Sequence, residues 1–150
     1  MTARIHVRPA RAFDAGAMAT LLNEIIAAGG TTALAGPVTG AQLRDWMASS
    51  DLWHLAETDG TILGFQWIGR SDELPEGACD IATFVAIGRH GLGVGSRLFD
   101  VTRAAAKRAG FKWIAARIKP YNEGGLAYYR SRGFEDWRVT PDRVTKRFDL

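Results

Sequence analysis

Hydrophobic and polar positions follow two periods along this chain. Between residues 13 and 30, apolar side chains recur three and four positions apart, which predicts an amphipathic helix. Asp14 is a candidate cap for this helix, and Gly29-Gly30 ends the pattern. A second helix is predicted over 39–50, because Thr39 and Gln42 have the spacing of a capping box. The positions expected to face inward are Met18, Leu21, Leu22, Ile25 and Ile26 in the first helix and Leu43, Trp46 and Met47 in the second.

Strand patterns dominate the middle and the end of the chain. Two β-prone runs around Asp59-Gly60 predict a hairpin over 52–70, and single strands are predicted at 4–10, 78–87, 111–118, 134–140 and 144–150. Further helices are predicted from Ser96 to Ala109 and, capped by Asn122, over 123–132; segments 31–38 and 71–77 are interpreted as loops. This order predicts one α+β domain over 1–150, with a mixed sheet and a β-α-β crossover in its second half.

The composition of the chain argues against several classes of function. Apolar residues make up 47% and charged residues 23%, which is typical of a globular protein. The net charge of +3, with scattered Lys and Arg, suits an anionic ligand and does not indicate nucleic acid as a partner. The lone Cys79 excludes an internal disulfide and a multi-Cys metal site, and we expect no metal. The sequence shows no membrane-spanning run and no signal peptide, so we expect a cytoplasmic protein without a membrane partner.

A glycine-rich turn stands out in "FVAIGRHGLGVGSRLFD", Phe84 to Asp100. An apolar run reaches Gly91, Gly93 and Gly95 directly before a helical pattern, an arrangement that typically faces a phosphate. A P-loop would need Lys and then Ser or Thr after its last glycine, where this sequence has Ser96 and Arg97. The spacing G-x-G-x-G departs from the dinucleotide fingerprint, although Arg117 on the next strand keeps an NADP-binding oxidoreductase as an alternative. A tight turn without a ligand is the other alternative.

Two motifs resemble one known superfamily. "RHGLGVGSRLF" resembles motif A of the GNAT superfamily of acyl-CoA-dependent N-acyltransferases, and "NEGGLAYYRSRGF" resembles its motif B. Residues 7–46 are similar in layout to the phosphinothricin acetyltransferase-like branch, with an Asn23-Glu24 pair, a Gly/Thr loop, a Pro-Val pair and a short helix that ends in Trp46. The resemblance covers nearly the whole chain. It implies a three-layer fold whose mostly antiparallel sheet contains a splayed parallel strand pair, with helices on both faces.

The resemblance implies acetyl-CoA as cosubstrate. The glycines would let backbone N–H groups approach its pyrophosphate, and the helix dipole would add to the attraction. A backbone N–H near Val85 would face the thioester carbonyl. His90 holds the position that is usually Arg or Gln. Three interpretations stay open: His90 acts there as a partial cation, Arg89 takes over the role of the usual Arg or Gln, or His90 is a solvated loop residue. The implied cofactor-binding residues are Phe84, Val85, His90, Gly91, Leu92, Gly93, Val94, Gly95, Ser96 and Asn122.

Acyl transfer to an amine requires two proton movements. The amine, with a pKa of about 10.4, must lose a proton, and the departing thiolate must gain one. The resemblance places Tyr129 as the general acid, with Tyr128 as second candidate and a packing role for Tyr129 as the alternative. Asp80, where the branch carries Glu, is the candidate base acting through a water; the alternative is a surface carboxylate. Glu24 and His54 are weaker candidates for the base.

The acceptor implied by the resemblance is a primary amine of a small molecule, such as an amino acid or an analogue. Residues 29–38 and the hairpin carrying Trp53, Phe65 and Trp67 are expected to frame its site. The superfamily transfers the acyl group directly, and Cys79 lacks a neighbouring activator for a covalent route. The family also implies a possible homodimer. An alternative function is that of a non-catalytic sensor that binds acyl-CoA, motivated by His90 in place of the usual Arg or Gln.

Overall fold

The computed structural model describes residues 4–32 and 34–150. The start of the chain, 1–3, and Ala33 of the predicted loop 31–38 lie outside the described residues. The elements, in chain order, are β1 (His6–Pro9), η1 (Ala12–Asp14), α1 (Ala15–Ala28), α2 (Gly40–Ser49), β2 (Leu52–Thr58), β3 (Thr61–Gly69), β4 (Ala78–Val85), α3 (Val94–Arg108), β5 (Trp113–Ile118), α4 (Glu123–Ser131), β6 (Glu135–Val139) and β7 (Val144–Asp149).

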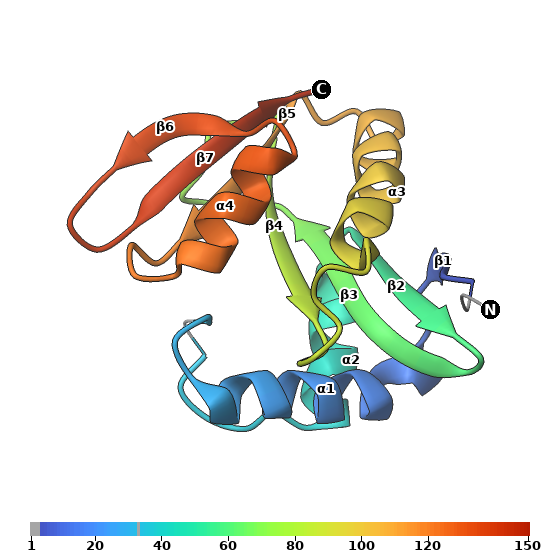
Figure 1. The fold of residues 1–150 in the computed structure, drawn as a ribbon. Helices are drawn as coiled ribbons and strands as arrows, with labels where there is room; N and C mark the ends of the chain where they lie inside the picture. Colours follow the sequence, from blue (N-terminus) through green and yellow to red (C-terminus); the bar gives the residue numbers. More distant parts are fainter. Residues whose placement is uncertain (1–3, 33) are drawn as a thin grey trace.

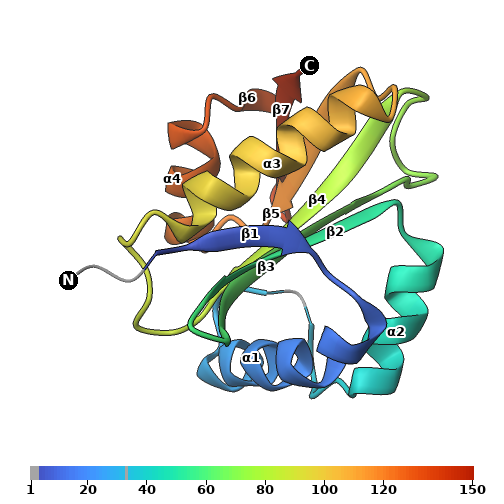
Figure 2. The same ribbon diagram turned by 90° about the vertical axis from the view of Figure 1, so that its right-hand side faces the viewer.

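The strands form one seven-stranded sheet in the order β1-β2-β3-β4-β5-β7-β6. In the described part of the chain every neighbouring pair is antiparallel except β4 and β5, which run parallel. Figure 1 shows α3 and α4 on one face of the sheet and α1 and α2 on the other. Figure 2 shows the same three layers from the side. The predicted α+β fold with a mixed sheet and helices on both faces is therefore confirmed.

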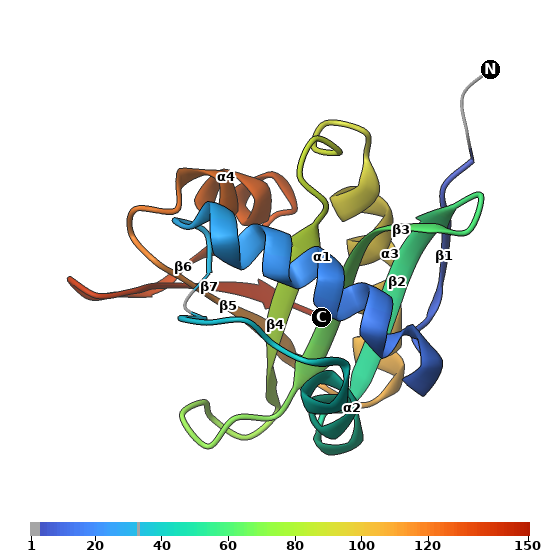
Figure 3. The ribbon, with the colours of Figure 1, turned by 90° about the horizontal axis from the view of Figure 1, so that it is seen from below.

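The hairpin between β2 and β3 follows from its turn residues. Asp59 has φ 49° and Gly60 has φ 79°, which are the left-handed positions of a tight turn. The register then places Leu55 opposite Phe65, so that both apolar side chains face the same side. Helices α1 and α2 cover that side, and Figure 3, which looks onto it, shows α1 crossing in front of the strands. A second core, which includes Phe99, Ile114 and Tyr129, lies between the sheet and the helices α3 and α4.

The parallel pair β4–β5 is splayed, as the resemblance implied. Its register comprises Ala78 with Trp113, Cys79 with Ile114 and Asp80 with Ala115. On its other edge β4 stays paired with β3 as far as Val85, which lies opposite Gly64. The second half of β4 therefore leaves β5 while it remains part of the sheet, and a slot opens between the two strands.

Most predicted helix ends agree with the structure. Gln42 donates its backbone N–H to Thr39 Oγ1 at 3.1 Å, and the Thr39 N–H donates to Gln42 Oε1 at 2.8 Å. The Asn122 Oδ1 accepts the Gly125 N–H at 3.0 Å. Helix α3, however, begins at Val94 and not at the predicted Ser96, because Gly93 in the left-handed region already serves as its N-cap.

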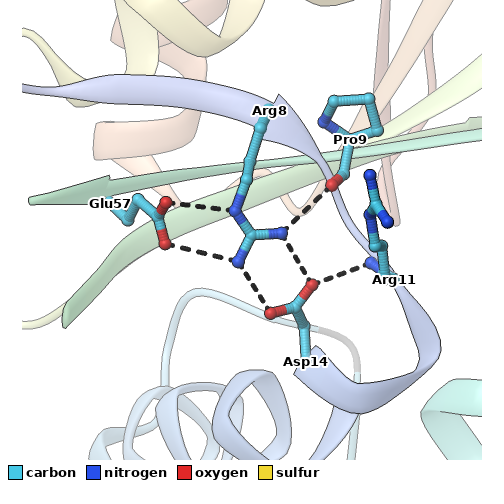
Figure 4. A network of polar contacts seen from close by, with 5 residues as sticks. All are labelled: Arg8, Pro9, Arg11, Asp14 and Glu57. Atoms are coloured by element: carbon cyan, nitrogen blue, oxygen red, sulfur yellow. Dashed lines mark hydrogen bonds and ion pairs between the residues drawn. The ribbon is translucent and has the colours of Figure 1, made fainter. Parts of the chain in front are cut away.

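Asp14 occupies the N-cap position of α1 as predicted, but its carboxylate makes no capping hydrogen bond, because partners outside the helix already engage it. Arg8 Nη1 and Nη2 donate to Asp14 at 2.9 and 2.8 Å, and the Arg11 backbone N–H donates at 2.8 Å. Arg8 Nε also donates to Glu57 of β2 at 3.1 Å, so the guanidinium lies between two carboxylates (Figure 4). The hydrogen bonds from Arg8 lower the pKa of Asp14. This network ties the entry of α1 to the edge of the sheet.

Replacing Asp14 by Asn is expected to lower the free energy of unfolding by about 2 kcal/mol at pH 7, because charge-assisted hydrogen bonds are lost. The folded-state pKa of Asp14 lies below its unfolded value of about 3.9, so its contribution is present above that pH and disappears as the pH falls through the folded value. Urea unfolding from pH 7 to pH 2 should show a weaker acid dependence in Asp14→Asn than in the wild type. Asp142→Asn, at an exposed position of the β6–β7 turn, is the control. Equal acid dependence in Asp14→Asn and the wild type would refute this role.

Candidate active site

The slot between β4 and β5 opens into a cavity of about 610 Å³, the main cavity. Every residue of β4 from Asp80 to Val85 lines it. Successive side chains of a strand point to opposite faces, so this continuous lining is possible only where the strand edge itself is open. Other walls come from helix α4, the end of β5, the end of α1 with the segment after it, and single residues of α2 and β3. Groups from both faces of the sheet therefore meet in one cavity.

The backbone of β4 also presents donors to the slot. The Ala86 N–H donates to the Leu63 carbonyl of β3 at 2.8 Å. Because N–H directions alternate along a strand, the N–H of Val85 points to the opposite edge, where the slot lies. Val85 thus has the orientation expected of a donor to a carbonyl oxygen in the cavity.

A second cavity of about 340 Å³ lies against the glycine turn. Val85, His90 and Tyr128 line both cavities, which therefore adjoin. Gly91 and Gly93 have φ values of 85° and 82°, and a Cβ atom at either position would meet nothing within 4 Å. The turn thus exposes its backbone N–H groups beside the start of α3, a donor set that fits a phosphate.

Nine of the ten residues predicted to bind the cofactor line one of these cavities. Phe84 and Asn122 line the main cavity, and Gly91, Gly93, Val94, Gly95 and Ser96 line the glycine-turn cavity. Leu92 lines neither cavity and is 54% exposed. Asn122 has a structural task as well, since it caps α4 and its Nδ2 donates to the Thr31 carbonyl at 3.2 Å.

Gly95 differs from the other glycines of the turn, because it lies within the first turn of α3. A Cβ atom there would stand 2.6 Å from Tyr128 Cε1. The Tyr128 hydroxyl donates to the Gly95 carbonyl at 2.7 Å. Gly95 is therefore needed for the close approach of an aromatic ring.

Tyr129 and Tyr128 project from α4 toward β4 and line the main cavity. Tyr129 is 7% exposed, and its Oη lies 2.7 Å from Thr83 Oγ1. Burial raises the pKa of Tyr129, and it raises the pKa of Tyr128 to about 12. Both phenols therefore keep their protons at neutral pH.

Asp80 lines the same cavity and forms an ion pair with Arg117 of β5. Arg117 Nε donates to Asp80 Oδ2 at 3.1 Å, and Arg117 also pairs with the exposed Glu73. Arg117 itself lines the cavity. The pair lies where the two parallel strands separate, because Asp80 belongs to the last residue pair of their register. A carboxylate and a cation thus stand side by side at the closed end of the slot.

Aromatic side chains form one wall of the main cavity. Trp46, Trp67 and Phe84 line it, and the Trp67 ring lies 6.1 Å from that of Trp46 and 5.4 Å from that of Phe84. Trp53 and Phe65 were also expected to frame the acceptor site, but they lie buried behind this wall as core residues. Lys119 and Arg143 add cationic groups to the lining.

The other titratable candidates lie away from the cavity. Glu24 is exposed on α1 and does not line it. His54 is buried under α3, where desolvation lowers its pKa and keeps it neutral. Burial raises the pKa of Cys79 to about 12, and its Sγ lies 3.8 Å from the Trp113 carbonyl, an environment that keeps it an inert thiol. Within the described residues there is no group of three His, Cys, Asp or Glu side chains able to hold a metal ion.

Sequence reasoning did not identify Thr83 and Gln66 as site residues. They lie opposite each other on β4 and β3, and Gln66 Nε2 donates to Thr83 Oγ1 at 2.9 Å. Each is a polar residue within an apolar strand run, "IATFVAI" and "ILGFQWIG". Such interruptions were the available signal, since a buried polar side chain requires a partner.

Comparison with known proteins identifies the class. Residues 18–134 match the family model described as the acetyltransferase (GNAT) family. A comparison with curated proteins gives no significant match. The chain therefore belongs to the acetyltransferase (GNAT) family and is an acetyl-CoA-dependent acyltransferase.

Solved structures show the same fold. A GCN5-related N-acetyltransferase from Kribbella flavida is 24% identical with a TM-score of 0.84, covering 97% of this chain and 98% of that one. A phosphinothricin acetyltransferase from Sinorhizobium meliloti in complex with AcCoA is 17% identical with a TM-score of 0.87, covering 97% and 88%. YncA, a putative acetyltransferase from Salmonella typhimurium with its cofactor acetyl-CoA, is 18% identical with a TM-score of 0.85, covering 97% and 94%. The doubly wound parallel sheet that a dinucleotide-binding oxidoreductase needs does not match this topology.

Gly95→Ala is expected to destabilise the protein by about 1–3 kcal/mol, because the new methyl group would displace the Tyr128 ring and break its hydrogen bond to the Gly95 carbonyl. Urea unfolding measures this change. Gly16→Ala in α1 is the matched control, since a Cβ there would meet nothing within 4 Å, and it should leave stability unchanged or raise it. A Gly95→Ala variant that unfolds at the wild-type urea concentration would contradict this role.

Proposed function

We propose that this chain is an N-acetyltransferase that transfers the acetyl group of acetyl-CoA directly to the primary amine of a small molecule, an amino acid or an analogue. One observation carries the proposal. Tyr129 from α4 and Asp80 from the other face of β4 line the same cavity at the splayed strand pair. An acid and a base on opposite sides of one slot match the two proton movements of acyl transfer.

The residues of the glycine turn would hold the pyrophosphate. Gly91, Gly93, Val94, Gly95 and Ser96 line the second cavity, and the last three of them begin α3, so their backbone N–H groups are the candidate donors. The exposed His90 lines both cavities and Arg89 lines the second one beside it, so both side chains are candidates to contact the pyrophosphate. The Val85 N–H would donate to the thioester carbonyl and stabilise the charge that develops on its oxygen.

Acetyl-CoA supplies an acetyl group activated as a thioester, and its departing sulfur needs a proton. Tyr129 would hold that proton at Oη and give it up as the carbon–sulfur bond breaks. Asp80 would accept the proton that the amine loses, through a water. Exchange of a proton with solvent then returns both residues to their starting states, so each turnover converts one amine and one thioester into one amide and one thiol.

The acceptor class rests on the other walls of the main cavity. Lys119 and Arg143 provide cations for an anionic group such as a carboxylate, while Trp46, Trp67 and Phe84 provide an apolar wall. A neighbour in fold is a phosphinothricin acetyltransferase, which agrees with an amino-acid-like acceptor. An acetylation screen would therefore begin with amino acids.

A cytoplasmic location and a homodimer stay predictions. Among the helices of the described residues, none has the length and hydrophobicity of a membrane span.

The non-catalytic sensor is the alternative function. It predicts that the protein binds acetyl-CoA, detected by calorimetric titration, and acetylates no amine in the screen. The proposal predicts binding together with turnover.

Tyr129→Phe is expected to lower kcat by about 10²–10⁴ while leaving the calorimetric Kd for acetyl-CoA within a few-fold of the wild-type value, because only the transferable proton is removed. Tyr121→Phe, at a position 63% exposed, is the control. An unchanged kcat in Tyr129→Phe, with an active wild type, would show that Tyr129 is not the acid.

Asp80→Asn is expected to lower kcat/KM for the amine by about 10²–10⁴ at pH 7. The loss should shrink as the pH rises toward the amine pKa of about 10.4, since more amine is then already deprotonated. Asp80 also pairs with Arg117, so Glu73→Gln serves as control: it removes the exposed partner of Arg117 and leaves Asp80 in place. If kcat/KM of the Asp80→Asn variant depends on pH in the same way as that of the wild type, Asp80 is not the base.

A further inference from the structure

A continuous chain of hydrogen bonds connects the glycine turn to Tyr129. The Tyr128 hydroxyl donates to the Gly95 carbonyl at 2.7 Å, and Gln66 Nε2 lies 3.3 Å from the same hydroxyl. Gln66 Nε2 also donates to Thr83 Oγ1 at 2.9 Å. Thr83 Oγ1 lies 2.7 Å from Tyr129 Oη. Four side chains from β3, β4 and α4 thus form one path between the cofactor loop and the proposed acid.

The Gly95 carbonyl orients the protons of Tyr128 and Gln66 at one end of this path. A carbonyl oxygen only accepts, so the single hydroxyl proton of Tyr128 is committed to Gly95. Tyr128 Oη must then accept from its other neighbour, which places the amide nitrogen of Gln66 there. The second proton of that nitrogen points to Thr83 Oγ1, which accepts it.

Thr83 and Tyr129 complete the path. Gln66 Nε2 donates in both directions along the path, to Tyr128 and to Thr83. With Oγ1 already accepting from Gln66, a Thr83 hydroxyl that donates to Tyr129 Oη makes the two bonds from Gln66 to Tyr129 run in the same direction, which polarises and strengthens both of them. In this arrangement Tyr129 accepts from Thr83, and its own proton is left to point into the main cavity. In the reverse arrangement the Tyr129 proton would be directed into the protein and away from a substrate.

We propose that Thr83 is a positioning residue that, oriented by Gln66, donates its hydroxyl to Tyr129 Oη and thereby directs the Tyr129 proton into the main cavity. The inference rests on the proposed function, in which Tyr129 is the acid. The same hydrogen bond stabilises the phenolate that remains after proton transfer, since a donor favours the charged form. Gln66 is fully buried and Tyr129 nearly so, which leaves little water to take over these roles.

Hydroxyl exchange measured by NMR tests the direction without any cosubstrate. In an equal mixture of H2O and D2O, the carbon that bears a slowly exchanging hydroxyl gives two resonances, and one that bears a fast-exchanging hydroxyl gives a single resonance. We expect a split Cβ resonance for Thr83 and a single Cζ resonance for Tyr129, whose proton faces the cavity. Tyr128, bonded to Gly95, should be split, and the exposed Tyr121 should be single; these are the only other tyrosines. A split Tyr129 Cζ with a single Thr83 Cβ would overturn the proposal.

Kinetics provides the second test. Thr83→Val keeps the shape of the side chain, removes the donor and is expected to lower kcat about ten- to a hundredfold, with KM for both substrates within a few-fold of wild type. Thr83→Ser should recover most of the lost rate. Gln66→Met, which removes both N–H donors, should lower kcat as well and make the Tyr129 proton exchange more slowly. Thr61→Val, at an exposed strand position, is the control.

The outcomes separate the two proposals. If Tyr129→Phe lowers kcat and Thr83→Val keeps the wild-type rate, Tyr129 remains the acid and the positioning role of Thr83 is wrong. If Tyr129→Phe itself keeps the wild-type rate, the proposed acid is wrong and the inference about Thr83 is wrong with it. A Thr83→Val variant whose loss lies in KM alone would also overturn the positioning role.

Discussion

The early end of pairing between β4 and β5 is the constraint on which the rest of the site depends. The two strands share a register only as far as Asp80 and Ala115, and the Asp80–Arg117 ion pair lies at that fork. Beyond it, the released edge of β4 gives the cavity its length, directs the Val85 N–H into the slot and lets side chains from both faces reach one space. A strand pair that stayed closed would keep the same residues in two separate layers.

The splay also explains how α4 contributes. Tyr128 and Tyr129 reach β4 across the slot, and Asn122 at the start of α4 bonds both to Gly125 and to Thr31 after α1. Contacts from one side of the sheet to the other therefore pass around the open edge of β4. The cavity is bordered by elements that hold one another in place, which suits a site that must keep its donors aligned before a substrate arrives.

Local patterns predicted most of the elements, because alternation, helical periodicity and turn residues such as Asp59-Gly60 act over a few positions. Asp14 shows where local reasoning fails: its strongest partner, Arg8, belongs to another element, and that bond replaced the expected cap. The site divides in the same way. Contiguous motifs located the glycine turn, whereas the role of Thr83 depends on its register with Gln66, 17 residues away, and no local pattern encodes a register between distant strands.

The walls of the main cavity come from different parts of the chain. His90 and the lining residues of β4, β5 and α4 lie after position 79, Trp67 lies in β3, and the end of α1, the segment that follows it and Trp46 lie before position 50. The groups proposed to bind the acetyl donor therefore all lie in the second half of the chain, whereas those proposed to bind the acceptor come from both halves. Natural variation or directed evolution confined to the first third of such a gene would change Trp46 and the segment after α1, one part of the proposed acceptor site, and would leave every residue proposed to bind the donor unchanged.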